Sequence, residues 1–583
     1  MESNTIIRQI EINGFRGIKF LKWNPSDGLN IILGGGDSGK TTILEAISLL
    51  FYPSNHLILS ESDYWLRNYS NGFSIEAVVK LSNSTEISQQ QKLNWPWEWN
   101  GADAVIPSLD EKDVLENSLE EAVYKFRVTG TPELELIWEI LQPDDTATHL
   151  SVGIRRNIGI VQLNSDERSD RDLRLVYGSA LDKLLSDKGL RARVGQEIVN
   201  INIEESLDPD GKIALNSLDK LFKEEALPNT LKLGLISKQG VSIGALVGLL
   251  AEKENVQLPL ISWGAGTRRM ATLGIASSSE TNSRIYVIDE LERGLEPYRQ
   301  RRLIRSLEDD GKQTFLTTHS PVVIGASLNS LLWYLDSNGQ LGELKQSKIK
   351  AQQKRDPETF LSKISVIAEG PTEVGFVSYL LEKAFDCNPL DFGVRVSDGQ
   401  GNDQVLNLLE AMSDAGLKFS GIADNENRSE GRWKKLKIKM KEHLLQWRIG
   451  CVEENVINNI DEKKLSELIK NSEGEMDGDR LRTLAHRLNL KEKDLSEIKS
   501  STDNFRDLII AAAIGKKDGA PTGKEKDWKK HSQKWFKSEE GGRELAMKMV
   551  SLGAWPYLHD DLLPFINSIL RAIGEKELIK LEL

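Results

Sequence analysis

The sequence predicts an α/β protein built from two successive parts, and three observations lead to this prediction. A glycine-rich phosphate-binding motif lies between an apolar strand and an amphipathic helix near the N-terminus. A second apolar strand, far downstream, ends in adjacent acidic residues. In the C-terminal half, further apolar segments end in carboxylates before turns or helices. Strands that alternate with helices in this way favour sheets with parallel strands.

Length and composition limit the class of protein. The chain has 583 residues, too many for one compact core, because domains average roughly 150 residues. No apolar run approaches the ~18 residues of a membrane span, and no leader pattern stands out, so we expect a cytoplasmic protein with no membrane partner. The two cysteines are expected to be buried, reduced thiols. The net charge of -13 argues against coating of nucleic acid through overall charge, but it leaves a local basic groove open.

The phosphate-binding motif matches G-x-x-x-x-G-K-[ST] from Gly34 to Thr41. In such a loop the glycines let backbone N–H groups face phosphates, and the helix N-terminus adds a positive dipole. Lys40 then bridges the outer phosphates, and the Thr41 hydroxyl ligates magnesium. The motif therefore predicts ATP binding together with one magnesium ion. The predicted nucleotide-binding residues of this loop are Gly34, Asp37, Ser38, Gly39, Lys40, Thr41 and Thr42.

A carboxylate pair follows the second apolar strand of this part. Asp289 is expected to hold the magnesium ion and Glu290 to orient the attacking water. His319 follows another strand-like segment, where it could contact a γ-phosphate. Small residues that include Gly264 and Gly266 precede a basic pair and a helical segment. A single histidine or Gly-Ala-Gly sequence is usually structural. The prediction that these two features bind nucleotide depends on their order and spacing relative to the phosphate loop and the carboxylate pair.

This part resembles the ATP-binding-cassette (ABC) ATPases of the recombination and chromosome-maintenance branch. Their N-terminus typically carries I-x-x-F-R-G before the phosphate loop, which is met here at Ile12 to Gly17. The resemblance implies a signature segment at Gly264 to Thr267 whose glycines reach a partner subunit's nucleotide, and a switch histidine at His319. It therefore implies a homodimer or a higher homo-oligomer. The sequence departs from the family at the GAGT signature and at Asp37, where asparagine is common.

A long segment separates the phosphate loop from the carboxylate pair. We predict a first domain at 1–345, with a helical insertion or dimerisation region at about 85–250. The tryptophan cluster from Asn94 to Gly101 lies in this insertion, where packing in an irregular loop is favoured over stacking on single-stranded bases. The polar stretch at 335–360 predicts the boundary to a second domain at 360–583.

Acidic residues follow three predicted strands of the second domain. The first strand ends in Glu369, and after a Gly-Pro turn the next helix begins with Glu373. Carboxyl ends of the strands in an α/β sheet face one crevice, where converging carboxylates are unfavourable unless cations neutralise them. Oxygen ligands suit Mg²⁺ or Mn²⁺, and two such ions ~3.5 to 4 Å apart can cleave a phosphodiester. The predicted metal ligands are Glu369, Glu373, Asp424, Glu426, Glu453 and Glu454, the last two at the end of the third strand and only one of them needed.

The second domain resembles the Toprim domain of type IA topoisomerases, primases and several nucleases. The matching residues are Glu369 and Glu373 in EGPTE, followed by Asp424 and Glu426, where Asp-x-Asp is usual. An ABC ATPase followed by Toprim is similar to the OLD (overcoming lysogenization defect) family of ATP-dependent endonucleases, which includes nuclease subunits of phage-defence systems such as Gabija and some retron effectors.

This resemblance implies an activity, cofactors and partners. The activity is a DNA endonuclease that depends on two Mg²⁺ or Mn²⁺ ions and is gated by the ATPase. The partners are DNA and a defence protein, either helicase-like or a retron reverse transcriptase with its msDNA. A catalytic lysine near the C-terminus is also implied, for which Lys537 is the best candidate and Lys534 and Lys548 are alternatives.

Other interpretations remain open. The basic segments Arg432 to His443 and Lys516 to Trp535 are either solvated helix faces or contacts with a DNA backbone. The alternative function is a DNA-repair or recombination ATPase without nuclease activity. A primase or topoisomerase is disfavoured, because two cysteines cannot build a four-cysteine zinc module and no motif identifies a strand-transfer tyrosine.

Overall fold

The computed structural model of the protein describes most of the chain. The described residues are 4–36, 38–55, 57–82, 95–107, 121–163, 173, 174, 176, 179, 181, 209, 212, 213, 216, 248–253, 255–278, 285–336, 339–471 and 473–581. Asp37 and most of the predicted insertion therefore lie outside the described residues.

The chain divides into two compact units, which are described in turn. The first unit comprises Met1–Ile10, Leu44–Gln300 and Lys312–Leu316. The second comprises Glu11–Ile43, Arg301–Gly311 and Thr317–Leu583. The domain boundaries expected from the sequence stay a prediction.

The first unit contains an antiparallel sheet. Trp97 and Trp99 belong to one of its strands, so the tryptophan cluster is not the irregular loop that we expected. The Trp97 indole donates to the Leu141 carbonyl at 2.8 Å, and Lys125 lies 3.6 Å from the centre of its ring. Trp97 is thus used for packing in the sheet. In pairing order the strands are β4 (Phe73–Lys80), β7 (Glu121–Gly130), β8 (Leu136–Leu141) and β9 (Ala147–His149), with β5 (Trp97–Trp99) on β7 and β6 (Ala104–Val105) on β5.

Three parallel strands in the first unit belong to a six-stranded sheet. β13 (Ile285–Ile288) lies between β10 (Ile160–Leu163) and β14 (Thr314–Thr317). All four residues of β13 are buried, as expected for a central strand with both faces covered. Helices α7 (Ala265–Ser278) and α8 (Pro297–Asp310) flank β13 in the sequence.

The polar stretch at the predicted domain boundary contains regular structure and lies in the second unit. Strand β15 (Leu331–Leu335) pairs in parallel with β3 (Leu29–Gly34) and antiparallel with β16 (Leu341–Leu344). Helix α10 (Gln346–Arg355) follows. Its Gln353 side chain is buried and donates to the carbonyls of Ile324 and Ser327, both at 2.8 Å. Glutamines on this helix are therefore core residues, which sequence polarity alone does not reveal.

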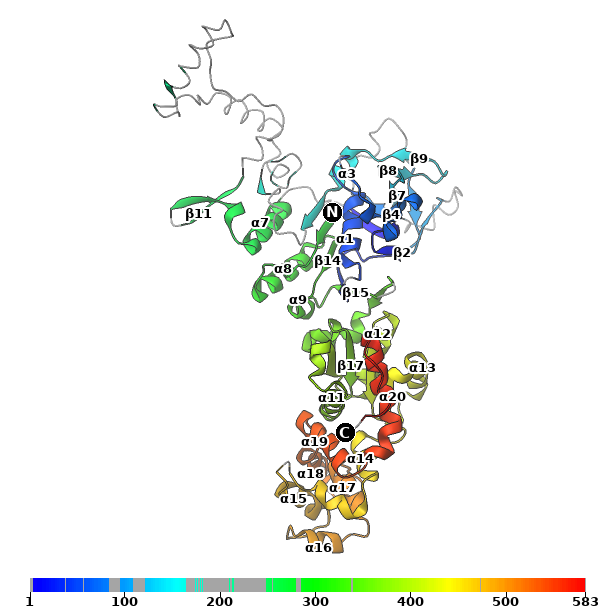
Figure 1. Cartoon of the computed structure of the whole chain (residues 1–583), viewed down its shortest axis with the longest axis vertical. Helices are drawn as coiled ribbons and strands as arrows, with labels where there is room; N and C mark the ends of the chain where they lie inside the picture. The colour runs from blue at the N-terminus through cyan, green and yellow to red at the C-terminus, as the bar shows by residue number, and fades with distance from the viewer. Residues whose placement is uncertain are drawn as a thin grey trace. The chain divides into compact units, whose positions relative to one another are not determined.

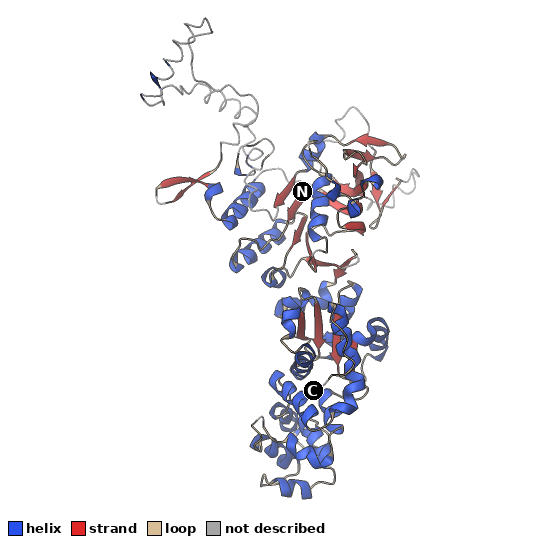
Figure 2. Ribbon diagram, viewed as in Figure 1, coloured by secondary structure: helices blue, strands red, loops and turns tan. Residues whose placement is uncertain are grey.

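The second unit also contains a four-stranded parallel sheet enclosed by helices, visible around the β17 label in Figure 1 and as red strands among blue helices in Figure 2. Helices α11, α12 and α20 each contact its central strand β17. This arrangement confirms the predicted mixed α/β class. The strand order is β18 (Val394–Asp398), β17 (Ile364–Ala368), β19 (Phe419–Ala423) and β20 (Leu444–Gln446). The helices are α11 (Pro371–Phe385), α12 (Asn402–Asp414) and α20 (Trp555–Ile573).

The third acidic strand lies earlier than the sequence predicted. The strand is β20, whereas Glu453 and Glu454 lie in the first turn of α14 (Val452–Asn458). A turn with Gly450 at φ +61° separates the two elements. The apolar residues after this turn follow helical spacing, and Val452 and Val456 are both fully buried.

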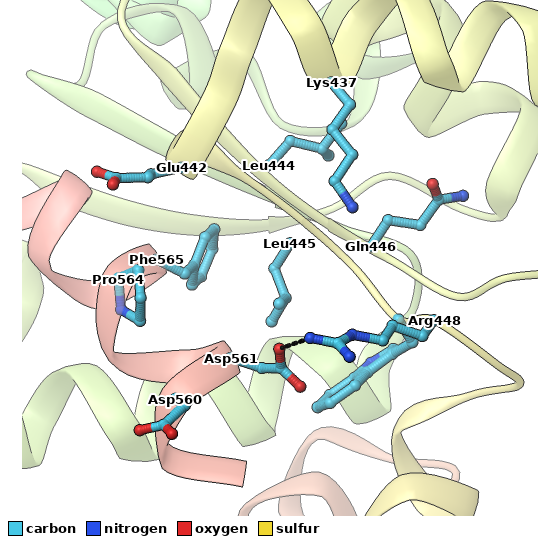
Figure 3. Close-up of a pocket in the computed structure, with 11 residues that line it drawn as sticks. Lys437, Glu442, Leu444, Leu445, Gln446, Arg448, Asp560, Asp561, Pro564 and Phe565 are labelled. Atoms are coloured by element: carbon cyan, nitrogen blue, oxygen red, sulfur yellow. Dashed lines mark hydrogen bonds and ion pairs between the residues drawn. The ribbon is translucent and has the colours of Figure 1, made fainter.

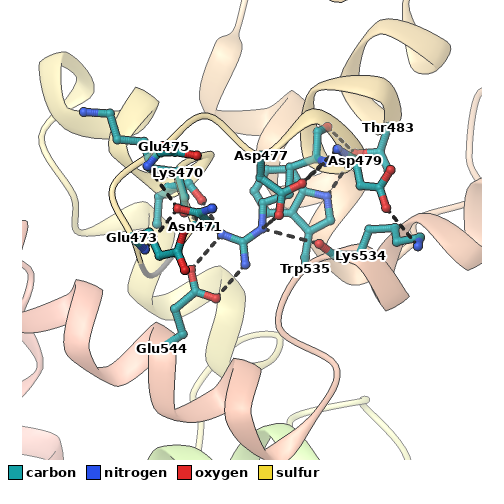
Figure 4. A network of polar contacts seen from close by, with 12 residues as sticks. Lys470, Asn471, Glu473, Glu475, Asp477, Asp479, Thr483, Lys534, Trp535 and Glu544 are labelled. Atoms are coloured by element: carbon teal, nitrogen blue, oxygen red, sulfur yellow. Dashed lines mark hydrogen bonds and ion pairs between the residues drawn. The ribbon is translucent and has the colours of Figure 1, made fainter.

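Helices complete the second unit, and two of them pack with almost no space between their backbones. A Cβ atom added to Gly375 on α11 would lie 1.8 Å from the Glu539 carbonyl oxygen of α19, so only glycine fits there. A buried Arg480 supports the same region through two hydrogen bonds to Glu544, at 2.8 and 2.6 Å (Figure 4). Helices in this C-terminal region include α15 (Gly478–Arg487), α16 (Leu495–Ser500), α17 (Phe505–Ile514), α18 (Glu525–Lys530) and α19 (Glu539–Ser551).

Two whole-chain expectations have different outcomes. Among the described residues, no helix combines the length and apolar character needed to cross a bilayer. Cys387 is exposed and Cys451 is partly buried, so the expectation of buried thiols is wrong for Cys387. Cys387 follows the end of α11, where the chain turns through Asp386 at φ +54°.

Candidate functional sites

The phosphate loop connects β3 to α1 (Lys40–Leu50) and is held by its own hydrogen bonds. The Lys40 ammonium is largely buried and donates to the carbonyls of Gly34 and Gly35 at 3.1 and 2.7 Å. The Ser38 hydroxyl donates to the Gly35 carbonyl at 2.9 Å. Gly39 adopts φ +100°, which residues with a side chain rarely adopt. The loop is therefore preformed as a compact ring at the helix N-terminus.

Two features of the loop suit phosphate binding. A Cβ atom at Gly34 would lie 2.7 Å from the Leu335 carbonyl oxygen, so glycine is required where the loop leaves β3. Thr41 and Thr42 occupy the first turn of α1, where the direction of the backbone N–H groups and the helix dipole favour an anion. Asp37, also predicted to bind nucleotide, lies outside the described residues.

The predicted carboxylate pair follows β13 in the first unit. Asp289 is largely buried, and Arg269 of α7 donates to its backbone carbonyl. Glu290 adopts φ +46°, a left-handed conformation that costs a non-glycine residue roughly 1 kcal/mol or more and is enriched at functional sites. Its side chain forms a partly exposed ion pair with Arg293 at 3.6 Å. The strained backbone supports a functional role for Glu290.

The remaining predicted nucleotide residues differ in their surroundings. A Cβ atom on Gly266 would lie 2.1 Å from the Gly294 carbonyl oxygen, so packing within the first unit requires this glycine. Gly264 has open space where its Cβ would be. His319 is exposed and lies in the second unit. Assembly of these residues into one ATP site stays a prediction.

Four carboxylates and one lysine gather in the second unit. Each comes from a different local element: Glu369 follows β17, Glu373 lies in the first turn of α11, Asp424 follows β19, and Glu453 lies in the first turn of α14. We call these four residues the carboxylate centre. The Lys537 ammonium lies 2.6 Å from Glu453 Oε1. Glu373 and Glu453 are 3% and 0% exposed, so the charges are concentrated in a protected space.

Burial is the largest influence on the pKa values of Glu369, Glu373 and Asp424 in the carboxylate centre. Burial, followed by repulsion from Glu453, raises the pKa of Glu373 to about 7. Burial and the charges of Glu373, Glu369 and Glu453 raise the pKa of Asp424 to about 9, although Asp424 as a whole residue is partly exposed. Burial, the largest single influence, would lower the pKa of Lys537, but the charge and hydrogen bond of Glu453 together with the charges of Cys451 and Glu373 outweigh it and raise this pKa. The centre therefore has more carboxyl groups than its one lysine can neutralise, and Glu373 and Asp424 keep their protons to a higher pH than usual.

The carboxylate centre has the donor chemistry for a divalent cation. Buried oxygens of three of its members have no hydrogen-bond partner: Glu373 Oε1, Asp424 Oδ1 and Glu453 Oε2. Leaving a buried polar atom unpaired is costly, and a cation would relieve both this cost and the repulsion. An all-oxygen set fits Mg²⁺ or Mn²⁺. Among the described residues, no three acidic, histidine or cysteine side chains lie close enough together to coordinate a metal ion as they stand.

Two predicted ligands lie outside the carboxylate centre. Glu426 is exposed and pairs with Arg428 at 3.5 Å, because the chain leaves the sheet at Asp424. Glu454 accepts a hydrogen bond from the Cys451 backbone N–H at 3.1 Å and so caps α14. Of the two adjacent glutamates, Glu453 is the one in the centre.

The alternative lysines are occupied elsewhere. Lys534 pairs with Asp479 at 3.0 Å, and Lys548 pairs with Glu544 at 2.6 Å. Lys537 is the candidate that the structure brings to the carboxylate centre.

Sequence reasoning missed Asn402, the first residue of α12. Its side-chain amide donates to Glu369 Oε2 at 2.9 Å and to the Asp424 carbonyl at 3.1 Å. Its oxygen accepts a hydrogen bond from the buried indole of Trp433 at 3.0 Å. Asn402 therefore fixes the orientation of Glu369. The sequence feature that could have indicated Asn402 is the glycine before it. Gly401 adopts φ +103° in the turn after β18 and precedes the first residue of α12.

Replacing Asn402 by alanine is expected to slow any metal-dependent reaction at this centre by about 10- to 100-fold, the usual cost of removing a group that orients a ligand. Trp433→Phe, which removes the indole N–H donor, is expected to have a smaller effect in the same direction. Reaction rates across a Mg²⁺ titration, with circular dichroism as the folding control, measure both. A fully active Asn402→Ala variant would show that Glu369 needs no orientation.

Comparisons with known proteins apply mainly to the N-terminal part. A family model described as "AAA domain, putative AbiEii toxin, Type IV TA system" matches residues 29–325, which is half of the chain. This span contains the phosphate loop, the carboxylate pair after β13 and His319. The carboxylate centre lies outside it.

Shorter matches occur to curated proteins. The DNA replication and repair protein RecF of Chloroherpeton thalassium is 35% identical over 78 residues, covering 13% of this chain and 21% of that protein. The Septu protein PtuA of Bacillus thuringiensis is 48% identical over 46 residues, covering 8% of this chain and 12% of that protein. The chain thus spans only a small share of the curated relatives that it matches.

Two solved structures are similar over much of their own length. The Smc head domain of Pyrococcus furiosus bound to the C-terminal domain of ScpA is 12% identical, with a TM-score of 0.34, and the match covers 60% of this chain and 98% of that chain. The recombination mediator RecF with a bound ATP analogue is 14% identical, with a TM-score of 0.33, covering 59% and 99%. TM-scores this low do not establish a shared function.

Proposed function

This chain belongs to the AAA_21 family of AAA domains, and we propose that its ATPase gates a divalent-metal-dependent DNA endonuclease in the same chain. Family membership makes the protein an ATP-binding ATPase. The nuclease is the further step, and one observation carries it: three buried carboxylate oxygens without partners in a centre that also holds Lys537.

In the proposed reaction the carboxylate centre holds the metal and Lys537 faces the phosphate. Glu373, Asp424 and Glu453 are the ligands, and Asn402 orients Glu369 toward them. Bound Mg²⁺ or Mn²⁺ supplies Lewis acidity and lowers the pKa of a water molecule. Lys537 then stabilises the negative charge that develops on the phosphate. The overall arrangement supports a Toprim-type centre and phosphodiester hydrolysis.

The proposed ATP site is of the ABC type. Lys40 and Thr41 bind the phosphates and magnesium, and Asp289 and Glu290 serve the metal and the attacking water. Gly264 and Gly266 approach the nucleotide of a second copy, while His319 contacts the γ-phosphate. This proposal requires at least a homodimer.

We propose a defensive role of the OLD type against phage. The family description, which names a toxin of a toxin–antitoxin system, supports it. DNA is the proposed substrate. A helicase-like protein or a retron reverse transcriptase with its msDNA is the proposed partner.

A DNA-repair or recombination ATPase without nuclease activity is the second candidate. The match to RecF, named as a DNA replication and repair protein, favours it. This function predicts ATP turnover with no strand cleavage in any metal.

Nicking of supercoiled plasmid separates the two candidates. The parent protein, Glu369→Ala and Lys40→Ala are compared in Mg²⁺ and in Mn²⁺, with and without ATP. We expect the parent to nick, Glu369→Ala to lose nicking but retain ATP binding, and Lys40→Ala to lose ATP binding. A Glu369→Ala variant that cuts as well as the parent would rule out the carboxylate centre as the nuclease.

A further inference from the structure

Helix α13 (Glu430–Met440) is attached to the second unit by a narrow buried stripe. Only Trp433 and Leu436 are buried, so most of the helix surface faces solvent. The exposed residues Lys434, Lys435 and Lys437 form no ion pair among the described parts of the chain. Lysines near a helix C-terminus often complement its dipole, but Lys434 and Lys435 lie in the middle of α13. Their charge is therefore not explained by contacts or by the helix dipole.

Arg432 anchors α13 to α12. The Arg432 guanidinium donates to both Glu410 oxygens on α12, at 2.9 and 2.7 Å, and to the Asn407 side chain at 2.7 Å. Lys348 adds a second pair to Glu410 at 2.8 Å. These cations, Arg432 first, lower the pKa of Glu410 to about 2. The unpaired lysines of α13 are thus displayed on a fixed element.

A neighbouring turn displays an arginine and an isoleucine. The Arg448 side chain is 85% exposed and Ile449 is 80% exposed. The backbone beneath them is fixed, because the Asn425 and Asn455 amides donate to the carbonyls of Arg448 and Ile449 at 2.6 and 2.8 Å. At Gly450 a Cβ atom would lie 1.7 Å from a Glu454 oxygen. The turn therefore holds an apolar side chain in solvent on a rigid support.

This turn and α13 adjoin each other and the carboxylate centre. Lys437 and Arg448 line one pocket, as Figure 3 shows. Its volume is about 240 Å³. The exposed pair between Arg448 and Asp561, at 3.2 Å, contributes little to stability and leaves the arginine available. Asn425, whose backbone N–H donates to the Gly450 carbonyl at 2.9 Å, directly follows Asp424 of the centre. Trp433 on α13 reaches the centre through Asn402.

We propose that α13 and the turn Arg448–Gly450 bind the backbone of double-stranded DNA and lead it to the carboxylate centre. Lys434, Lys435, Lys437 and Arg448 contact phosphates, which supply most of the affinity in protein–DNA complexes. Ile449 packs against a sugar in the minor groove, where apolar side chains accompany basic ones. The inference rests on the proposed nuclease, because this surface is proposed to deliver DNA to the carboxylate centre beside it.

Binding of a fluorescently labelled duplex, followed by anisotropy with Ca²⁺ in place of Mg²⁺ over a range of salt concentrations, tests this surface. The triple variant Lys434→Gln, Lys435→Gln, Lys437→Gln is expected to bind about 10- to 100-fold more weakly. The salt slope, which is the steepness with which log K falls as log[salt] rises, is expected to become shallower by about 2 to 3, close to one per lost phosphate contact. Arg448→Gln is expected to lower the slope by about 1. Ile449→Ser is expected to weaken binding several-fold with the slope unchanged, because no charge is removed.

Exposed lysines outside both basic segments provide a matched control with the same change in charge. The variant Lys463→Gln, Lys491→Gln, Lys493→Gln is expected to keep the parent's slope and affinity. The proposal is overturned if this control loses as much affinity as the α13 variant, or if the α13 variant binds like the parent. In the latter case the lysines serve another partner, such as an acidic protein.

Plasmid nicking by the same variants separates this inference from the proposed nuclease. If the parent binds DNA through α13 but never cuts, the nuclease fails and the DNA surface stands. If the parent cuts and the α13 variant binds and cuts equally well, the surface fails and the nuclease stands.

Discussion

Glu373→Gln is expected to abolish metal-dependent nicking while making the metal-free protein more stable above about pH 7. The substitution keeps the size of the side chain and removes its charge. Glu373 is 3% exposed, and its Oε1 atom has no hydrogen-bond partner. Removing a residue that supports a metal ligand can lower activity ~100-fold, and removing a ligand itself is expected to lower activity at least as much. The same change removes a buried charge that repels Glu453.

The direction of the stability change follows from the pKa. The pKa of Glu373 is raised from 4.5 to about 7 in the folded state. Between these values the folded protein keeps a proton that the unfolded chain releases, so stability falls as pH rises through this window. Glutamine undergoes no such loss, and we expect Glu373→Gln to be more stable than the parent by ~1–3 kcal/mol at about pH 8.

Thermal unfolding in EDTA at about pH 5 and pH 8 measures this effect. The parent is expected to lose more stability between the two values than the variant. Equal losses in the two proteins would show that Glu373 is not a source of strain in the carboxylate centre. Adding Mg²⁺ should raise the unfolding temperature of the parent and leave that of the variant nearly unchanged.

Lys537→Met is expected to destabilise the protein by about 3 kcal/mol, because it leaves the Glu453 charge buried without its partner. Glu453 is 0% exposed, and its Oε1 lies 2.6 Å from the ammonium. We place the cost at the lower end of the range for broken buried pairs, since the Lys537 side chain is 34% exposed and solvent screens part of its charge. Urea unfolding in EDTA is the measurement.

Two further variants show whether the pair is the cause. Glu453→Gln combined with Lys537→Met is expected to recover most of the lost stability, which a double-mutant cycle measures as a coupling energy. Lys534→Met is the matched control: Lys534 pairs with Asp479 at 3.0 Å, but its side chain is 54% exposed, so a change within about 1 kcal/mol is expected. If Lys537→Met costs no more than the control, Lys537 does not neutralise Glu453.

Local sequence was a good guide where one continuous segment makes the structure. The phosphate loop, its strand and its helix are consecutive, so residue spacing alone predicted them and the family match followed. Glu369 and Glu373 were predicted at a strand end and a helix start for the same reason, and they lie there.

Sequence was a poor guide where polarity and burial disagree. The stretch after β15 is polar in sequence, yet it forms helix α10, and buried glutamines such as Gln353 make this helix part of the core. The segment from Arg448 was expected to be a strand. Its apolar residues instead belong to a helix start, because Gly450 turns the chain and Glu454 caps α14.

The sequence by itself determined the α/β class, the ATPase family and the presence of acidic residues after several strands, because these depend on residues close together in the chain. Only the tertiary structure decided which acids share a buried space. It placed Glu453 with Lys537, left Glu426 in solvent and brought Asn402 to Glu369, 33 residues away. These outcomes depend on packing between distant segments. Burial and mutual repulsion at that meeting point raise the pKa values of Glu373 and Asp424, which is why the chemistry of the centre was visible only in three dimensions.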